Sequence, residues 1–162
     1  MTEVGFYPVR RRLKGSYIVL PELLQRIEAF DGNGWCRKLA ERVEKSFCAD
    51  DNLMLAIAVM SDEGKMIGHV VAGLELMLGQ ATVLVYQFAK DKGADPEPLE
   101  TNQELQRMIE GWAVSLASAK GIEINHVTIM CKDEKRERLF QKFGYESGPR
   151  VMRKEIGNGR NI

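Results

Sequence analysis

The chain has 162 residues, with 23 basic and 23 acidic side chains, so its formal net charge is zero. This balance provides no general attraction to nucleic acid or to an anionic membrane. Apolar residues make up 44% of the sequence, which excludes intrinsic disorder for most of the chain and is typical of a globular protein. We expect one domain, with its core at residues 5–156 and a frayed tail at residues 157–162.

The cysteines and the longest apolar run indicate the compartment. The three cysteines are an odd number and form no C-x-x-C pair, so a disulfide framework is not expected and a reducing cytoplasm is favoured. The longest unbroken apolar run, Leu53 to Met60, has eight residues, whereas a membrane span needs about 20. We therefore expect no membrane association.

The N-terminal part predicts two short helices. Apolar residues recur with helical spacing over residues 21–30 and again over residues 35–48, each forming one stripe. Pro21 fits the first turn of the first helix, where its missing N–H costs nothing. A strand is expected before these helices, between Val4 and Leu20.

The middle of the chain predicts three strands in an antiparallel meander. The strand segments are Leu53–Val59, Met66–Leu78 and Ala81–Ala89, and short turns at Ser61–Lys65 and Gly79-Gln80 join them. Turns this short connect neighbouring antiparallel strands.

A long helix follows at residues 101–120. Thr101 reads as its N-cap, with Glu104 completing a capping box, and Lys120-Gly121 reads as its end. Its apolar stripe consists of Leu105, Met108, Ile109, Trp112, Ala113, Leu116 and Ala117.

The C-terminal part predicts a strand at Ile124–Cys131, a short helix from Asp133 to Phe143, and a last strand at Val151–Ile156. Because the long helix joins two strands as a crossover, those strands are expected to run parallel. The fold class is therefore α/β (α+β), a mixed sheet with an antiparallel meander, a central crossover helix and a parallel strand pair.

This order of elements resembles the GNAT-type N-acetyltransferase superfamily over roughly residues 5–156. Leu139-Phe140-Gln141-Lys142-Phe143-Gly144-Tyr145 is similar to the family's late Leu-Tyr-x-x-x-Gly-Phe segment. The helix from Leu105 to Gly121 is similar to its central helix. The resemblance implies transfer of an acetyl group from acetyl-CoA to an amine on a small molecule or a protein.

The resemblance also implies a cofactor site between the third meander strand and the central helix. The backbone near Gln87 would meet the acyl group and the pantetheine arm, and the start of the long helix would hold the diphosphate. The cofactor-binding residues implied in this way are Gln87, Phe88, Ala89, Thr101, Asn102, Gln103, Asp133 and Phe140.

Two departures from the family favour an alternative, a catalytically degenerate member that binds a partner or has a structural role. The segment Glu97–Asn102 has no glycine, although Gly93-Ala94 could be another cradle. Phe140 stands where family members often carry the tyrosine that protonates the leaving thiolate. Carboxylates crowd the region before the long helix, with only Lys92 against them: Asp91, Asp95, Glu97, Glu100 and Glu104.

Two residues are candidates for acid–base catalysis. Glu75 is the only acidic side chain inside the predicted meander strands and is the candidate base. The alternative is a solvated residue on an exposed face. Tyr145 is the candidate acid, and its alternative is a core aromatic residue.

The remaining reactive side chains predict structural roles. His69 and His126 are interpreted as half-buried histidines, because no cluster has metal-ligand spacing. Cys131 shares a strand face with Val127 and Ile129, which predicts a buried thiol. The basic runs at residues 10–14 and 132–142 lack interleaved aromatic residues, so they are interpreted as solvated faces and no nucleic-acid partner is expected.

Overall fold

The structure is a computed structural model that describes residues 5–8, 16–31, 34–61, 63–131 and 134–147. The chain divides into two compact units, Met1–Ile129 and Met130–Ile162. The first unit contains β1 (Gly5–Pro8), α1 (Ser16–Ala29), α2 (Gly34–Ala49), β2 (Met54–Met60), β3 (Met66–Met77), β4 (Gln80–Lys90), α3 (Pro98–Lys120) and β5 (Val127–Ile129). The second unit contains α4 (Glu134–Gln141).

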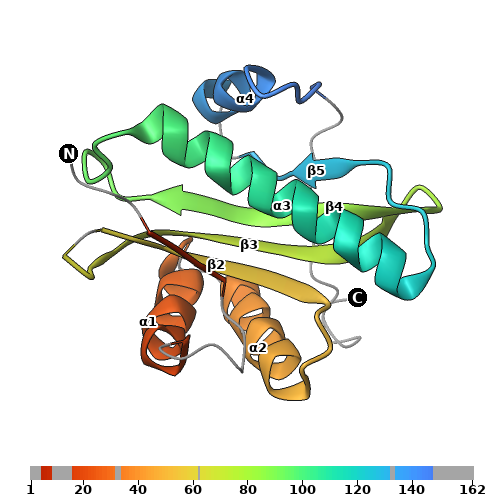
Figure 1. The fold of residues 1–162 in the computed structure, drawn as a ribbon, viewed down its shortest axis with the longest axis horizontal. Coiled ribbons are helices and arrows are strands. Elements are labelled where there is room, and N and C mark those ends of the chain that lie inside the picture. The colour runs from red at the N-terminus through yellow and green to blue at the C-terminus, as the bar shows by residue number, and fades with distance from the viewer. Residues whose placement is uncertain (1–4, 9–15, 32–33, 62, 132–133, 148–162) are drawn as a thin grey trace, which may run out of the picture. The chain divides into compact units, whose positions relative to one another are not determined.

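The five strands form one sheet in the order β1-β2-β3-β4-β5 (Figure 1). Strands β1 to β4 pair antiparallel with their neighbours, whereas β5 pairs parallel with β4. Helix α3 is the connection between β4 and β5. The predicted meander, crossover helix and parallel strand pair are therefore confirmed.

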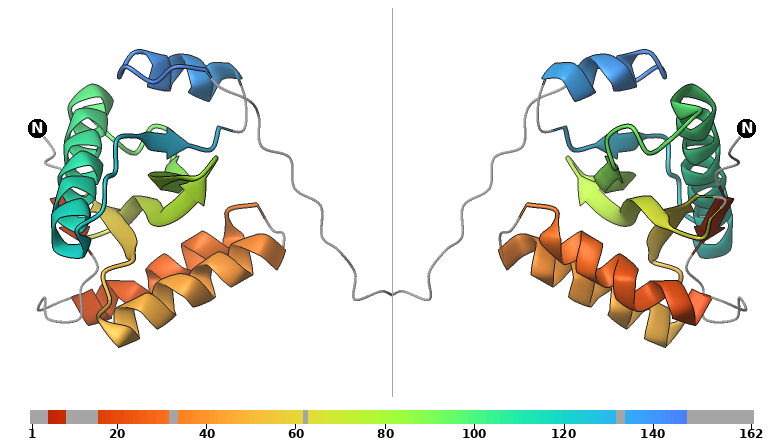
Figure 2. Two further views of the ribbon diagram at one scale, coloured as in Figure 1. Left: turned by 90° about the vertical axis from the view of Figure 1, so that its right-hand side faces the viewer. Right: turned by 90° about the vertical axis from the view of Figure 1, so that its left-hand side faces the viewer.

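Helices cover both faces of this sheet (Figure 2). Helices α1 and α2 pack on one face, where Leu23 and Val43 lie in one apolar cluster with Ala56, Ala58 and other strand residues. Helix α3 covers the opposite face. Alternate side chains of β2 point to opposite faces, and all from Leu55 to Met60 are buried. The strand therefore contributes to both halves of the core, which explains its unbroken apolar run.

Strand β4 contains one more residue than its partner β3 can oppose. Val71 pairs with Gln87 and Ala72 pairs with Val85, so Tyr86 has no partner of its own. This is a β-bulge, which increases the local twist and changes the direction of the side chains that follow. The sequence of β4 has no glycine that would have predicted it.

Two helix starts differ from the predictions. Helix α1 begins at Ser16, so Pro21 lies inside the helix rather than in its first turn. Burial of Leu23 and Ile27 offsets the cost of an interior proline. Helix α3 begins at Pro98, with Glu97 at the N-cap and no side-chain cap, so the prediction of Thr101 as N-cap was wrong. Proline supplies the helical φ at the first position and so moves the start three residues earlier.

The end and the buried stripe of α3 agree better with the sequence. Gly121 adopts the left-handed conformation, with φ of 63°, and ends the helix as predicted. Ile109, Trp112 and Leu116 are buried, while Met108 is only half-buried. The expected last strand at residues 151–156 lies outside the described residues.

Truncation of Trp112 tests the packing of α3. Trp112 is 5% exposed, and its indole Nε1–H donates to Asn52 Oδ1 at 3.4 Å. We expect Trp112→Ala to lower the free energy of unfolding by about 3–5 kcal/mol, because transfer energy is lost and a cavity forms. Urea denaturation measures this loss. Val114→Ala, on the exposed face of the same helix, is the control and should change stability by less than about 0.5 kcal/mol. A loss below about 1 kcal/mol for Trp112→Ala would contradict the packing described.

Candidate functional site

The parallel pair β4–β5 ends before β4 itself does. Its last pair is Val85 with Ile129, while β4 continues to Lys90 and stays paired with β3 up to Gly68. The β5 side of residues 86–90 therefore lies outside the β5 ladder. This segment starts at the bulge and contains Gln87, Phe88 and Ala89, the three strand residues that the sequence predicted to meet a cofactor.

The side chain of Gln87 ties β4 to three other elements. Its Nε2 donates to the carbonyl oxygen of Ile27 at 3.1 Å and to Cys36 Sγ at 3.6 Å. Its Oε1 accepts from His69 Nε2 at 2.7 Å. Since a backbone carbonyl can only accept, the amide has one orientation and Nε2 of His69 carries the proton. Gln87 thus fixes the bulged strand against α1, α2 and β3.

His69 is a neutral imidazole with one unused nitrogen. It is 2% exposed, and burial lowers its pKa to about 4, although the Gln87 hydrogen bond favours the charged form. Its Nδ1 has no hydrogen-bond partner among the described residues. The charges nearby belong to Arg26 and Asp91, which form an ion pair at 2.8 Å and act on the His69 pKa in opposite directions. His69 is therefore fully buried, rather than half-buried as the sequence predicted.

Glu75, the predicted base, lies in a second polar cluster. Its Oε1 accepts from the Tyr86 hydroxyl and from Arg42 Nη1, the latter at 3.0 Å. Arg42 Nη1 also donates to the Tyr86 hydroxyl at 3.2 Å. Tyr86 reaches Glu75 by passing over Gly73, where an added Cβ would lie 3.0 Å from the tyrosine ring and 2.7 Å from Met54 Sδ. Burial raises the pKa of Tyr86, so its hydroxyl stays protonated.

The structure does not bring Glu75 next to the backbone of Gln87. Glu75 pairs with Thr82, whereas the partner of Gln87 is Val71. Glu75 lies four positions along β3 from Val71, which corresponds to about 13 Å. The Glu75 side chain is 32% exposed, so it is neither fully solvated nor buried. Its role as a base stays a prediction.

The start of α3 is organised by the chain's own side chains. Asp95 Oδ1 accepts the N–H of Glu97 at 2.9 Å, and Pro98 has no N–H to offer. The Thr101 N–H donates to the Glu97 carbonyl. The N–H groups of Leu99 and Glu100 are the ones directed out of the helix end. Among the three predicted contacts in this helix, Thr101 and Asn102 are buried and Gln103 is exposed. Their cofactor role stays a prediction.

Most of the carboxylates near this helix end have a cationic partner. Asp91 pairs with Arg26, Asp95 with Lys90 and Glu104 with Arg107. Glu97 and Glu100 act on each other, and a hydrogen bond and the charge of Glu100 raise the pKa of Glu97. The sequence predicted that five carboxylates would repel an anion at this helix end. In the structure this repulsion comes mainly from Glu97 and Glu100.

The second unit holds the predicted acid and two of the predicted cofactor residues. The rings of Phe140 and Tyr145 lie edge to face, with centroids 5.7 Å apart, and the Tyr145 N–H donates to the Phe140 carbonyl at 3.2 Å. Tyr145 is half-buried. Asp133 lies outside the described residues. The roles of all three residues stay predictions.

Two burial predictions for residues near β5 were wrong. His126 and Cys131 are both exposed, rather than half-buried and buried. The reason is that β5 is only three residues long, so both residues lie beyond its ends. Within the described parts of the chain, no three histidine, cysteine or acidic residues could hold a metal ion. No helix in those parts is long and apolar enough to cross a membrane.

The sequence did not predict the partners that organise these clusters. Arg42 lies among the charged residues between the apolar positions of residues 35–48, which by themselves indicate only a surface position. The resemblance implied a role for Gln87 only through its backbone. Lys90 and Asp95 are five positions apart on either side of a strand end, a spacing with no regular period. No signal in the sequence indicates the pair.

Comparisons with known proteins identify the fold. No family model matches the chain, and no curated protein sequence matches it. Among solved structures, AAC(6')-Iy in complex with the bisubstrate analog CoA-S-monomethyl-acetylneamine has a TM-score of 0.65 and 13% identity, covering 96% of this chain and 99% of that chain. Glucosamine-6-phosphate N-acetyltransferase from Arabidopsis thaliana has a TM-score of 0.60 and 13% identity, covering 94% and 99%.

The same fold also occurs under a different functional name. A transcriptional regulator from Bacillus halodurans has a TM-score of 0.57 and 13% identity, covering 95% of this chain and 100% of that chain. The chain therefore has the fold of the GNAT acetyltransferases, as the resemblance implied. At these identities the likeness concerns the fold, and the activity must be argued from the site.

The pH dependence of stability tests the neutral state of His69. The pKa of His69 is about 4 in the folded chain and about 6.5 when unfolded. The unfolded state therefore binds the proton first as pH falls, and His69 lowers stability progressively between about pH 6.5 and pH 4, by about 3 kcal/mol in all.

Urea denaturation of the native chain and of His69→Gln at pH 7 and pH 4.5 measures this loss of stability. The variant should lose less stability over this range than the native chain. An equal loss of unfolding free energy between pH 7 and pH 4.5 in the two proteins would show that His69 is not held neutral.

Proposed function

We propose that the chain transfers an acetyl group from acetyl-CoA to the amine of a small molecule. One observation carries the proposal. In a fold shared with acetyltransferases, β4 continues beyond its last pair with β5 from a bulge at Tyr86. A strand edge that leaves its ladder offers backbone N–H and C=O groups to an extended ligand.

The two ends of acetyl-CoA fit the described residues unequally. The acyl and pantetheine end fits the edge of residues 86–90. Asn102 Oδ1 is buried without a hydrogen-bond partner among the described residues, and an amide N–H of the pantetheine arm would satisfy it. The diphosphate end fits poorly as the loop stands, because Asp95 already takes the N–H of Glu97 and Pro98 has none.

Acetyl-CoA would supply the acyl group as a thioester that an amine can attack. The chain's contribution is to hold the acyl end along Gln87–Ala89, on a strand whose position is fixed by the Gln87 side chain. Glu75 is proposed as the base and Tyr145 as the acid, the roles that the sequence predicted. Phe88 is proposed to line the same edge.

The acceptor is proposed to be a small amine rather than a macromolecule. One solved structure with this fold is an aminoglycoside acetyltransferase in complex with sisomicin, with a TM-score of 0.56 and 12% identity over 95% of each chain. Zero net charge offers no general attraction to nucleic acid. We also propose a cytoplasmic location, since three cysteines without a predicted pairing fit a reducing compartment.

A non-catalytic protein that binds a partner is the second candidate. Two observations favour it: Phe140 cannot protonate a thiolate, and Asp95 and Pro98 use the places at the start of α3 that an anion would need. The occurrence of the fold in a transcriptional regulator is compatible with such a role.

Acetyl-CoA binding tests the proposal directly. We expect acetyl-CoA at 100 times its dissociation constant to add about 2.7 kcal/mol to the free energy of unfolding, measured as a rise in melting temperature. Replacing both Glu97 and Glu100 by glutamine should tighten binding roughly 3- to 10-fold by removing repulsion, and the gain should shrink as salt rises.

Glu110→Gln, an exposed change on the same helix, is the control and should leave the affinity unchanged. If neither the native chain nor the double variant is stabilised by millimolar acetyl-CoA, the enzyme proposal falls and the partner-binding candidate replaces it.

The role of Glu75 can be separated from that of its neighbours by Glu75→Gln. Glutamine keeps an acceptor for Tyr86 and Arg42, so stability should fall by no more than about 1 kcal/mol. A base contributes roughly 10²- to 10⁴-fold to the rate, so we expect kcat to fall at least 100-fold if Glu75 removes the amine proton. Initial rates across pH measure this effect. A change below about threefold would assign Glu75 to the Arg42–Tyr86 cluster alone, in keeping with its separation of about 13 Å along β3 from the partner of Gln87.

A further inference from the structure

Two buried polar atoms of opposite kind lie beneath the end of α1. His69 Nδ1 and Arg26 Nε both lack a hydrogen-bond partner among the described residues. Because Nε2 of the same imidazole donates to Gln87, Nδ1 of the neutral ring can only accept, whereas Arg26 Nε carries a proton and can only donate. Buried polar groups in proteins are normally hydrogen-bonded. The pair therefore indicates a site for a group that both accepts and donates.

Contacts from α1 and β4 put the two side chains in one cluster. The ring of Phe30 packs edge to face on the His69 imidazole, with centroids 6.0 Å apart, and Arg26 lies one helical turn before Phe30. Arg26 also forms an ion pair with Asp91 at 2.8 Å. Asp91 follows two residues after Ala89, which pairs with His69 on β3. The charge of Arg26 acts on the pKa of His69, as expected for neighbours.

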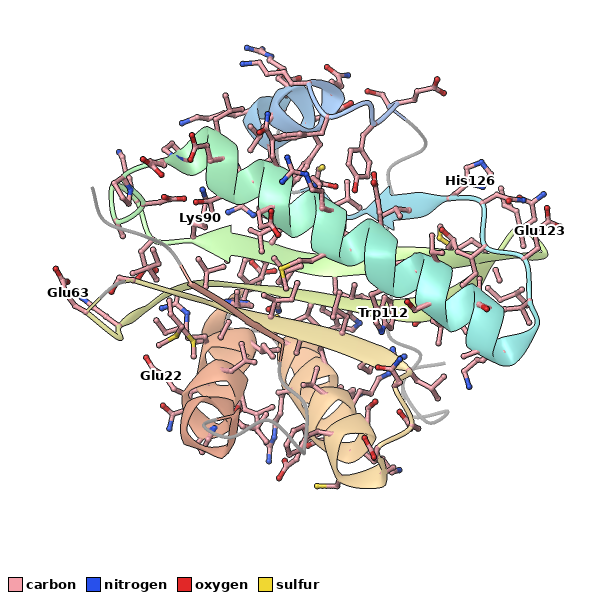
Figure 3. The ribbon with its side chains drawn as sticks, viewed as in Figure 1. Glu22, Glu63, Lys90, Trp112, Glu123 and His126 are labelled. Atoms are coloured by element: carbon pink, nitrogen blue, oxygen red, sulfur yellow. The ribbon has the colours of Figure 1, made fainter. Side chains whose placement is uncertain are left out.

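This cluster adjoins the segment of β4 that is proposed to hold the acyl group. Figure 3 labels Lys90 at the end of β4 and Glu22 on α1, and the ion pair of Arg26 with Asp91 joins these two elements. Within the acyl segment, Gln87 bonds His69 directly. The acceptor must reach this segment, so the cluster lies where another part of the acceptor molecule can bind.

The ion pair is the solvent-facing side of the cluster. His69 is 2% exposed, whereas the side chains of Arg26 and Asp91 are 23% and 45% exposed. Ion pairs that stay this open to water contribute little to stability, so this pair opens at small cost. A ligand therefore reaches His69 Nδ1 when the side chains beside it move.

We propose that His69 Nδ1 and Arg26 Nε form a subsite for a hydroxyl group of the acceptor, which is then an amine that also carries hydroxyl groups. A hydroxyl accepts from Arg26 and donates to His69. An ammonium cannot accept from Arg26, and a carboxylate cannot donate to His69. No covalent bond forms or breaks in this step. The inference rests on the proposed function for the identity of the molecule as the acceptor.

The first test compares two amines that differ only in hydroxyl groups. The probes are 2-deoxystreptamine and cis-1,3-diaminocyclohexane, which share one carbon ring and its two amines. In calorimetric titrations we expect the hydroxylated probe to bind at least about 10-fold more tightly, because its analogue leaves the polar atoms of the subsite unpaired. Equal affinities, or no binding of the hydroxylated probe, would overturn the proposal.

Substitutions that remove one atom of the subsite separate ligand binding from packing. In His69→Gln, an amide N–H replaces the imidazole N–H toward Gln87, while Nδ1 is lost. Arg26→Lys keeps a positive charge beside Asp91 and loses the Nε–H. Each variant should reduce the preference for the hydroxylated probe to below about threefold and leave the affinity for the other amine unchanged. Arg37→Lys, at an exposed side chain of α2, is the control and should keep the native preference. A native preference in both subsite variants would overturn the proposal.

Nitrogen NMR of the native chain covers the case in which these variants do not fold. His126 is the other histidine of the sequence, and His126→Gln assigns the signals by removing its own. The hydroxylated probe at saturation should shift the His69 Nδ1 signal, whereas the analogue should not. A water molecule is the other source of a hydroxyl for this site. A resident water gives no response of Nδ1 to either amine, and that result would overturn the proposal.

The subsite and the proposed function fail in different ways. If the hydroxylated probe binds more tightly and shifts the His69 Nδ1 signal but no amine is acetylated, the subsite stands and the acetyltransferase proposal falls. If the chain acetylates both amines with equal kcat/KM and the Nδ1 signal does not respond, the acetyltransferase proposal stands and the subsite falls.

Discussion

The bulge at Tyr86 is the constraint on which the candidate site depends. In a regular strand, consecutive side chains point to opposite faces. Here Tyr86 and Gln87 both contact the layer of α1 and α2: Tyr86 bonds Arg42, while Gln87 bonds Cys36 and the Ile27 carbonyl. Only the extra residue opposite Val71 allows this. The bulge thereby puts the Gln87 side chain on the same side of the sheet as the cluster of Glu75, Arg42 and Tyr86.

The end of the β5 ladder follows at the same point. Thr82 holds β5 at its start through the His126 carbonyl, at 2.9 Å, and the last pair is Val85 with Ile129. The bulge comes next, and the twist that bulges introduce turns the strand away from a straight neighbour. Past this point β4 is held from the β3 side and by Gln87. A well-fixed strand with one edge outside its ladder is a suitable surface for an extended ligand, which is the physical basis of the proposed function.

The sequence predicted the order of elements well, because hydrophobic periodicity and turns set it. The predicted strand segments 53–59, 66–78 and 81–89 agree with β2, β3 and β4 to within one residue at each end. The site was predicted less well, because its partners come from distant elements. Nothing in the periodicity of residues 35–48 connects Arg42 with Glu75, and nothing in β4 predicts an unopposed Tyr86. The prediction of Thr101 as N-cap was wrong because Pro98 is a strong helix starter, and it lies three residues before the capping-box pattern.

Hydrogen exchange of the β4 backbone tests most directly whether residues 86–90 form the acyl site. The native chain is compared with and without saturating acetyl-CoA, and exchange is followed peptide by peptide. We expect protection to increase in the segment from Tyr86 to Lys90 and at the start of α3, and to stay unchanged around Glu75 and in α2. Saturable binding with no added protection at residues 86–90, or with protection confined to the α2 side of the sheet, would contradict it.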